Sequence, residues 1–269
     1  MNLLHTLLLL LTTSLFTSAN ACSVFYYIDK ATGKIYVANN EDYFFDVNAY
    51  IQIEPATKDK LANLWYGWDK FAQGGINEAG LFFDGAVTPE QSVPKGHKNK
   101  KGNLGRDLLA TCHNVTEALH LLEERNIILN NAHMMLGDST GNAVVVEWLD
   151  GVKTITTIKD NRLVMTNFLL ADTTQGNYPC YRYNSIIDKM NAAEGKDSLS
   201  FLEVSNFLSG AAQPPNSVEG KTGGTLYSTF INISDMKLVL VYQLDNKKVT
   251  KLDLKKTFAQ GKRRKIPLK

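Results

Sequence analysis

The chain has 269 residues, of which 44% are hydrophobic and 21% charged, and its 29 basic and 27 acidic side chains leave a formal net charge of +2. This composition is that of a globular protein with a sizeable core, and it excludes a disordered, collagen-like or coiled-coil chain. The near-balance of charge argues against a nucleic-acid partner, and three cysteines without CxxC spacing argue against a disulfide-stapled mini-protein or a structural zinc site.

Residues 1–21 have the layout of a secretory signal peptide. A short hydrophobic run around residues 7–11 gives way to small polar residues and to Ala-Asn-Ala at residues 19–21. The run is shorter than the roughly 20 apolar residues of a membrane-spanning helix, and the two alanines are the small side chains that signal peptidase requires. We therefore expect cleavage after Ala21 and before Cys22, and a secreted or periplasmic protein. The first five residues carry no Lys or Arg, which is unusual for a signal peptide. Two alternatives stay open: an amphipathic or buried N-terminal helix, and a lipoprotein signal with an acylated Cys22, which is less favoured because Ala19 stands where a lipobox has Leu.

The remaining chain, residues 22–269, is expected to form a single domain that is rich in strands. Residues 23–29 and 35–38 carry strand-forming side chains, and the intervening residues 31–34 have turn chemistry, which predicts an N-terminal hairpin. Further strands are predicted over residues 51–53, 80–83, 134–137, 143–148, 153–158, 163–166, 226–233 and 237–244.

Helical spacing of apolar residues is found in fewer stretches. Residues 104–125 show it, and Asn114 followed by Glu117 could instead cap a second helix inside this range. Two shorter helices are predicted over residues 181–191 and 199–208. Two polar stretches, residues 90–103 and 211–224, are predicted to be surface loops that could border a site. Because strands come in groups with helices between them, the pattern favours an α+β fold with largely antiparallel sheets.

Cleavage before Cys22 would create a residue that carries both a thiol and a free α-amine. The ordinary pKa is about 8.5 for a thiol and about 8 for an α-amine, so near neutral pH the amine can accept the proton of the thiol, directly or through water. Cys22 is therefore a candidate nucleophile with its own base. The alternative is that Cys22 is an ordinary small core residue.

Several segments, taken in order, resemble one protein family. They are CSVFYYIDKATGKIYVANNED at 22–42, GGINEAGLFFDG at 74–85, LGDSTGNAVVVEW at 136–148, VMTNF at 164–168, the run 179–187 and GGTLYSTFINISDMKLVLVY at 223–242. On these motifs the chain resembles the choloylglycine hydrolase and linear-amide C–N hydrolase family of N-terminal nucleophile hydrolases. That group includes the penicillin V acylase and acyl-CoA:6-aminopenicillanate acyltransferase branches.

The resemblance implies an α+β fold, a four-layer αββα sandwich of the N-terminal nucleophile hydrolase type, formed by one catalytic domain. It implies that Cys22 attacks a non-peptide amide to form a thioester that water hydrolyses, without a cofactor or metal. Asp42 would hold the amine and thiol region, and Asn77 and Asn167 would lie at the oxyanion hole, where neutral donors stabilise the tetrahedral intermediate. Without the resemblance, the simpler interpretation of these residues is structural: Asn167 would close a turn and Asp42 would cap a loop.

One position departs from the family pattern. Asn39 stands where choloylglycine hydrolases carry an Arg, and a neutral amide lacks the charge and the fork geometry of a guanidinium. This difference argues against bile-salt specificity and leaves thiolate formation to the α-amine and backbone donors. Arg182 or Arg162 could supply the charge from elsewhere, and we expect Asn39 and Arg182 to bind substrate.

The other cysteines fit structural roles better. Cys112 lies on an apolar helical stripe beside His113, and adjacent helical residues point about 100° apart, so the pair is predicted to be core and not a catalytic dyad. Cys180 could pair with Cys112 in an oxidising compartment. The basic run at residues 262–265 is predicted to be a solvated tail.

The function expected from the sequence is therefore a secreted or periplasmic amidase that acts on a small-molecule acyl amide. Two alternatives stay open: an acyltransferase that passes the acyl group from the same thioester to an amine, and a secreted binding protein on this fold that has lost activity. Neither nucleic acid nor a membrane is an expected partner after signal cleavage, and a homo-oligomer is compatible with the sequence.

Overall fold

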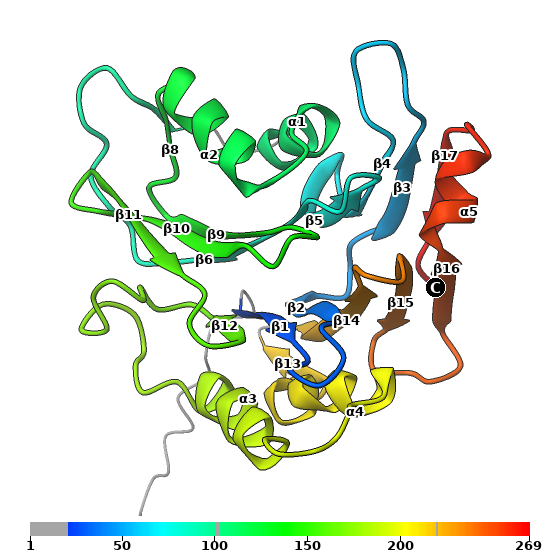
Figure 1. The fold of residues 1–269 in the computed structure, drawn as a ribbon. Helices are drawn as coiled ribbons and strands as arrows, with labels where there is room; N and C mark the ends of the chain where they lie inside the picture. The colour runs from blue at the N-terminus through cyan, green and yellow to red at the C-terminus, as the bar shows by residue number, and fades with distance from the viewer. Residues whose placement is uncertain (1–20, 100–102, 219) are drawn as a thin grey trace, which may run out of the picture.

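Two antiparallel sheets lie face to face between layers of helices in the computed structural model, which describes residues 21–99, 103–218 and 220–269 (Figure 1). The signal peptide predicted over residues 1–21 lies outside the described residues except for Ala21. In the described part of the chain, no helix combines the length and the apolar character needed to cross a bilayer.

The first sheet has seven strands in the order β12-β1-β2-β14-β15-β16, with β13 beside β14. Its strands are β1 (Ala21–Ile28), β2 (Ile35–Phe44), β12 (Arg162–Met165), β13 (Asn216–Val218), β14 (Lys221–Asn232), β15 (Lys237–Tyr242) and β16 (Val249–Asp253). β1 and β2 form the predicted N-terminal hairpin, whose turn contains Gly33 at a φ of 69°, a backbone conformation that glycine adopts without a steric penalty.

The second sheet has eight strands in the order β11-β10-β9-β6-β5-β4-β3-β17. They are β3 (Tyr50–Glu54), β4 (Asn63–Trp68), β5 (Phe71–Asn77), β6 (Phe82–Val87), β9 (Ala132–Gly137), β10 (Ala143–Leu149), β11 (Val152–Thr157) and β17 (Arg264–Pro267). A separate short parallel pair is formed by β7 (Lys98–Asn99) and β8 (Ile127–Ile128).

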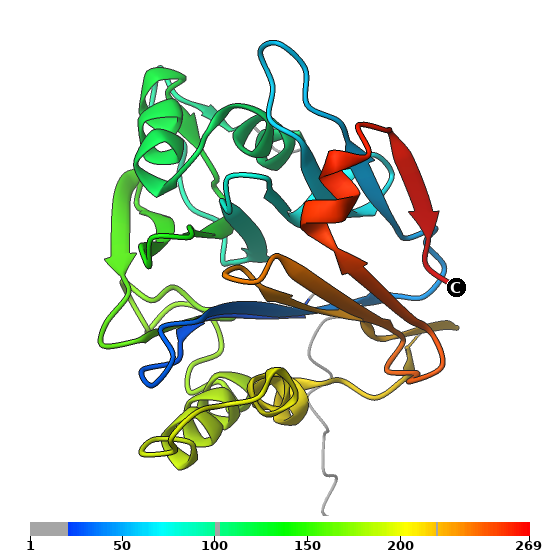
Figure 2. The same ribbon diagram turned by 45° about the vertical axis from the view of Figure 1, so that its right-hand side comes forward.

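Helices cover the outer faces of both sheets (Figure 2). α1 (Leu104–Thr111) and α2 (Val115–Glu124) pack on the eight-stranded sheet through one buried apolar cluster. α3 (Tyr181–Ala192), α4 (Phe201–Ser205) and the 3-10 helix η1 (Asn206–Ala211) pack on the seven-stranded sheet through another, and α5 (Leu254–Ala259) connects β16 to β17. The architecture is therefore the predicted α+β, four-layer αββα sandwich.

The largest core cluster lies between the two sheets, and β1 is buried on both of its faces. Successive strand residues point to opposite faces. Cys22, Val24 and Tyr26 accordingly belong to the cluster between the sheets, whereas Phe25 and Tyr27 pack in the cluster beneath α3 and η1. This alternation places the thiol of Cys22 on the side of the second sheet.

The helical range 104–125 divides into two helices. α1 ends at Thr111, and the Asn114 side chain caps α2 by accepting a hydrogen bond from Glu117 N at 2.9 Å. The capped alternative is therefore confirmed, and a single helix over the whole range is wrong.

Several strands differ from the prediction. β4 and β5 lie where no strand was expected, because the glycines at 67, 74 and 75 interrupt the apolar alternation of that stretch. The predicted loop over residues 211–224 contains β13 and the start of β14. The basic run at 262–265 is not a free tail, since its second half enters β17 and pairs with β3.

The two remaining cysteines lie in opposite helix layers. Cys112 follows α1 and packs in the cluster beneath α1 and α2, whereas Cys180 precedes α3 on the far side of the molecule. Both are free and buried. The pairing between them is therefore wrong, and the core position predicted for Cys112 is confirmed.

Candidate active site

Cys22 lines an apolar cavity of about 240 Å³. The residue is 4% exposed and lies near the start of β1, in the core cluster between the two sheets. Polar residues, among them Glu41 and His133, form part of the lining, and large apolar side chains come from both sheets, from α1 and from the loop before β9: Tyr43, Trp68, Phe71, Phe83, Leu104, Leu129 and Met134. An apolar cavity beside a thiol is suited to the hydrocarbon part of an acyl group.

Asn167 binds the main-chain nitrogen of Cys22. Asn167 Oδ1 accepts hydrogen bonds from Cys22 N at 2.9 Å and from Arg182 Nη2 at 2.8 Å, while Nδ2 donates to Val87 O at 2.9 Å. These two donors fix the orientation of the Asn167 amide, because in the flipped orientation the amide NH₂ group would face the N–H groups of Cys22 and Arg182. The structure thus brings Asn167 to Cys22 as an acceptor that orients the nitrogen. Its expected action as an oxyanion donor, through the second Nδ2 hydrogen, stays a prediction.

Arg182, in the first turn of α3, supplies a buried positive charge to the site. Its Nη1 donates to Cys22 O at 2.6 Å and to Ser23 Oγ at 3.1 Å, and it lies 3.9 Å from Asp42 Oδ2. Because the guanidinium is planar and forked, it binds the β1 backbone and the Asn167 amide together. The fork therefore holds the residue that carries the thiol against the residue that orients its nitrogen.

Glu41 is a site residue that the sequence interpretation missed. The register of β1 and β2 sets Glu41 directly opposite Cys22, and Cys22 Sγ donates to Glu41 Oε1 at 3.4 Å. Asp42 was favoured because it ends the Asn-Asn-Glu-Asp motif, but its side chain points to the other face of the strand. The hairpin itself carried the missing signal, since pairing Ile28 with Ile35 at the turn sets residue 22 opposite residue 41.

Asp42 lies on the opposite face of β2, where its Oδ1 accepts a hydrogen bond from Thr225 Oγ1 at 2.6 Å. A bulge in β14 between Thr225 and Tyr227 shifts the register, so that Thr225 pairs with Asp42 and Tyr227 pairs with Glu41. Burial raises the pKa of Asp42 to about 7, although the Thr225 hydrogen bond and the Arg182 charge act to lower it. Asp42 therefore acts on the thiol through its charge and through Arg182.

A second buried carboxyl group, Asp84 in β6, lies near Glu41. Asp84 Oδ2 accepts a hydrogen bond from Tyr66 Oη at 2.9 Å, whereas Asp84 Oδ1 and Glu41 Oε2 have no hydrogen-bond partner among the described residues. Burial raises the pKa of both carboxyl groups well above the usual range, and Asp84 raises that of Glu41 further. Burial also raises the pKa of the Cys22 thiol, and the neighbouring carboxyl groups add to this against the opposing guanidinium. The thiol therefore needs a base before it can attack.

Asn77 is not part of this site. Its Nδ2 donates to two carbonyl oxygens at the end of α1, and its Oδ1 accepts from two amides of the β5–β6 turn: Leu109 O at 3.0 Å, Cys112 O at 2.7 Å, Ala79 N at 3.1 Å and Leu81 N at 3.0 Å. These bonds occupy both amide hydrogens and both oxygen lone pairs. The preceding Ile76 faces the space between the sheets, so Asn77 faces α1, away from Cys22. The oxyanion role expected of Asn77 is corrected to a structural one.

Asn39 differs from its expected place, and of the two arginines considered as a source of charge only one reaches the site. Asn39 is buried in β2, its amide has no hydrogen-bond partner among the described residues, and it does not line the cavity with Cys22. Arg162, at the sheet edge, pairs with Glu194 at 3.6 Å. Arg182 is therefore the arginine that reaches the thiol residue. In the described ranges, no three His, Cys, Asp or Glu side chains are arranged to hold a metal ion.

Comparison with known proteins gives one family and a common fold. The model of a family described as acyl-coenzyme A:6-aminopenicillanic acid acyl-transferase matches residues 29–244. No curated protein matches the chain. The structure of penicillin V acylase from Agrobacterium tumefaciens is 20% identical, with a TM-score of 0.69 over 87% of each chain. A variant of the conjugated bile acid hydrolase from Clostridium perfringens is 17% identical, with a TM-score of 0.74 over 91% of this chain and 97% of that one.

Proposed function

Because the chain belongs to the acyl-coenzyme A:6-aminopenicillanic acid acyl-transferase family and has the fold of N-terminal nucleophile hydrolases, we propose that it is an enzyme that hydrolyses a carbon–nitrogen bond of a small acyl amide. One observation carries the proposal. The thiol of Cys22 lines an apolar cavity while the nitrogen of the same residue is held by Asn167. A nucleophile, its potential base and a place for an acyl group are thereby combined at one residue.

The first step of the proposed mechanism prepares the nucleophile. Cleavage between Ala21 and Cys22 converts the peptide nitrogen of Cys22 into an α-amine, which Asn167 Oδ1 is placed to hold. The amine then accepts the thiol proton, directly or through water. Glu41 Oε1, at 3.4 Å from Sγ, offers a second acceptor, and the raised pKa of this carboxyl group makes it a stronger base than an exposed Glu.

The chemical steps then follow acyl transfer to sulfur. Cys22 Sγ bonds to the amide carbonyl carbon, and the resulting oxyanion is expected to receive a hydrogen bond from Asn167 Nδ2. The C–N bond breaks as the α-ammonium gives its proton to the leaving amine, which leaves a thioester. Water next attacks the thioester while the α-amine takes its proton, the C–S bond breaks, and the thiol and a carboxylic acid are released.

The cavity supports a preference for apolar acyl groups. Aromatic and aliphatic side chains form most of its lining, and among the described residues no Lys or Arg side chain lines it to pair with an anionic acyl chain. Penicillin V and N-acyl amino acids are therefore substrates to test first. Conjugated bile salts are the contrasting test, because Asn39 replaces the arginine of the bile-salt enzymes that the chain resembles.

Acyl transfer to an amine is the second candidate, favoured by the family description. It uses the same thioester and differs only in the acceptor, since an amine replaces water. An inactive binding protein is less well supported, because Arg182 supplies the cation that Asn39 lacks. Measuring how the products partition between acid and new amide as an added amine is increased separates hydrolase from transferase.

The proposed chemistry requires Cys22 to be the N-terminal residue. We propose that the segment over residues 1–21 directs secretion or periplasmic export and is removed there. N-terminal sequencing of the protein after expression in a secreting host tests this directly. A chain that starts elsewhere, or a lipid on Cys22, would remove the proposed base.

A substrate screen with matched variants tests the function. Wild type, Cys22→Ala and Cys112→Ala are each incubated with penicillin V, acyl homoserine lactones, N-acyl amino acids and conjugated bile salts. Turnover by wild type and Cys112→Ala, with none by Cys22→Ala, supports the proposal. Turnover that survives in Cys22→Ala, or no turnover of any acyl amide by a correctly processed wild type, contradicts it.

A further inference from the structure

His133, in β9, is fully buried, and both nitrogens of its ring face oxygen atoms. Nδ1 lies 2.7 Å from Glu147 Oε1, and Nε2 lies 2.6 Å from Thr166 O. A carbonyl oxygen only accepts hydrogen bonds, so Nε2 carries a hydrogen. If Glu147 is a carboxylate, Nδ1 carries one as well, and the ring is an imidazolium.

The hydrogen bonds of Glu147 support this charge assignment. Besides the ring of His133, Glu147 receives Leu170 N on Oε1 and Ala171 N on Oε2, each at 2.8 Å. With one backbone N–H on each oxygen, both oxygens already act as acceptors, which favours the ionised carboxylate. The side chain is fully buried, and a buried carboxylate is tolerated when it is paired and hydrogen-bonded.

The pair holds one short segment at two points. Glu147 binds the amides of residues 170 and 171, and His133 binds the carbonyl oxygen of Thr166. Asn167 lies between these points, and the Thr166 carbonyl belongs to the planar peptide group that leads into it. His133 and Glu147 come from the eight-stranded sheet, whereas this segment follows β12 of the seven-stranded sheet. The pair therefore ties the two sheets together beside the site.

We propose that His133, as an imidazolium paired with Glu147, is a positioning residue that sets Asn167 against the nitrogen of Cys22. The path runs from the His133 ring to the Thr166 carbonyl, through its peptide group to Asn167, and from Asn167 Oδ1 to Cys22 N. The inference rests on the proposed function, since the position of Asn167 affects rate only if Cys22 is the nucleophile. A purely structural pair would affect stability and leave kcat unchanged.

The protonation of the ring is measured on an active, folded protein. Replacing the three exposed histidines, in H97Q/H113Q/H120Q, leaves His133 as the one imidazole in residues 22–269. With nitrogen-15-labelled histidine, we expect both ring nitrogens to show the chemical shifts of N–H groups at pH 7.5. A shift typical of an unprotonated ring nitrogen at that pH would overturn the proposal.

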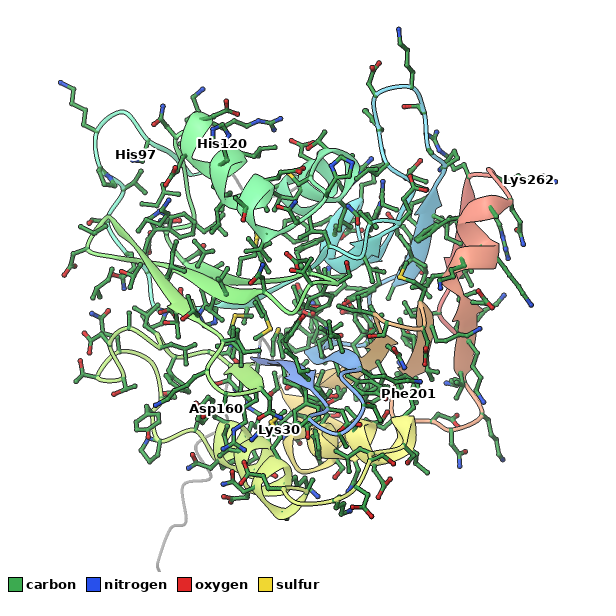
Figure 3. All side chains as sticks on the ribbon, in the orientation of Figure 1. Lys30, His97, His120, Asp160, Phe201 and Lys262 are labelled. Atoms are coloured by element: carbon green, nitrogen blue, oxygen red, sulfur yellow. The ribbon has the colours of Figure 1, made fainter. Side chains whose placement is uncertain are left out.

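The positioning role is measured by kinetics on His133→Gln, with His120→Gln as the control. His120 lies on the outside of α2 and is exposed, so its replacement leaves the Asn167 segment untouched (Figure 3). We expect His133→Gln to lower kcat about 10- to 100-fold with KM within about threefold, the cost of misplacing a group near the reacting atoms. His120→Gln is expected to match wild type.

The outcomes separate the two claims. An unchanged kcat in folded His133→Gln, or a changed KM alone, overturns the positioning role while the proposed function stands. An inactive wild type whose His133 shows two N–H signals contradicts the proposed function instead. If thermal unfolding shows that His133→Gln does not fold, the same kinetics are measured on Glu147→Gln, and an unchanged kcat in that folded variant overturns the positioning role.

Discussion

Replacing Arg182 by Lys isolates the role of the guanidinium fork, because the positive charge is kept and the second arm is lost. In the structure, one arm donates to Cys22 O at 2.6 Å and Ser23 Oγ at 3.1 Å, and the other donates to Asn167 Oδ1 at 2.8 Å. An ammonium is a compact point charge on a flexible stem and cannot reproduce this planar two-armed contact. Arg182→Lys therefore loses at least one charge-assisted hydrogen bond.

The expected magnitude follows from that loss. A hydrogen bond to a charged group contributes about 1.5–3 kcal/mol, and a tenfold change in rate corresponds to about 1.4 kcal/mol. If the lost bond is the one to Asn167, we expect kcat/KM to fall by about 10- to 100-fold. The free energy of unfolding is expected to fall by about 2 kcal/mol, because the remaining charge is still buried.

The assay compares kcat/KM and urea unfolding for wild type, Arg182→Lys and the control Arg162→Lys. Arg162 pairs with Glu194 at 3.6 Å at the sheet edge, so its replacement tests the general cost of an arginine-to-lysine change. We expect the control to keep kcat/KM within about twofold of wild type. If folded Arg182→Lys also keeps kcat/KM within about twofold of wild type, the guanidinium fork does not hold Cys22 and Asn167 together in the active enzyme. That result would refute the reasoning.

Three further predictions follow from the site and its surroundings. Asn167→Ala is expected to lower kcat/KM about 10²-fold, mainly in kcat; a raised KM alone in steady-state assays would assign it to substrate binding. Cys112→Ala is expected to lose about 1–3 kcal/mol in urea unfolding and keep its activity, and a folded but inactive variant would make Cys112 the better nucleophile. Because the folded pKa of Asp42 is raised to about 7, the folded state binds more protons than the unfolded state below that pH. The free energy of unfolding should therefore fall by up to ~4 kcal/mol from pH 4 to pH 7, and urea titrations of Asp42→Asn should show a shallower slope; equal slopes would contradict this.

The α+β class with antiparallel sheets was predictable because its signals are local, whereas the four-layer arrangement was expected only from the family resemblance. Alternating strand residues, the hairpin turn before Ile35 and the Asn114 cap each depend on a few neighbouring side chains. β4 and β5 escaped notice because glycines replace side chains on strands that are buried among their neighbours. β17 was missed because a run of basic residues is typical of a solvated tail. Its strand conformation depends on pairing with β3, which is distant in the sequence.

The candidate site was predictable in part, since sequence order identifies residues but not the faces to which they point. The structure brings Cys22, Arg182 and Asn167 together, as expected. Asn167 was expected to act as a donor, but its amide oxygen accepts a hydrogen bond from the Cys22 nitrogen. Glu41 was missed because the choice between it and Asp42 depends on strand register. Asn77 was misplaced for a similar reason, since its side chain faces the opposite side of its sheet.

Acylation of Cys22 is the central claim, and mass spectrometry of the trapped enzyme tests it most directly. Mature wild type and Cys22→Ala are mixed with a hydrolysed acyl amide, quenched in acid to preserve a thioester, and digested. We predict that wild type carries the mass of the acyl group on the peptide that begins with Cys22, and that the variant carries none. An acyl group on Cys112 or Cys180, or turnover without any acyl-enzyme on Cys22, would contradict the account.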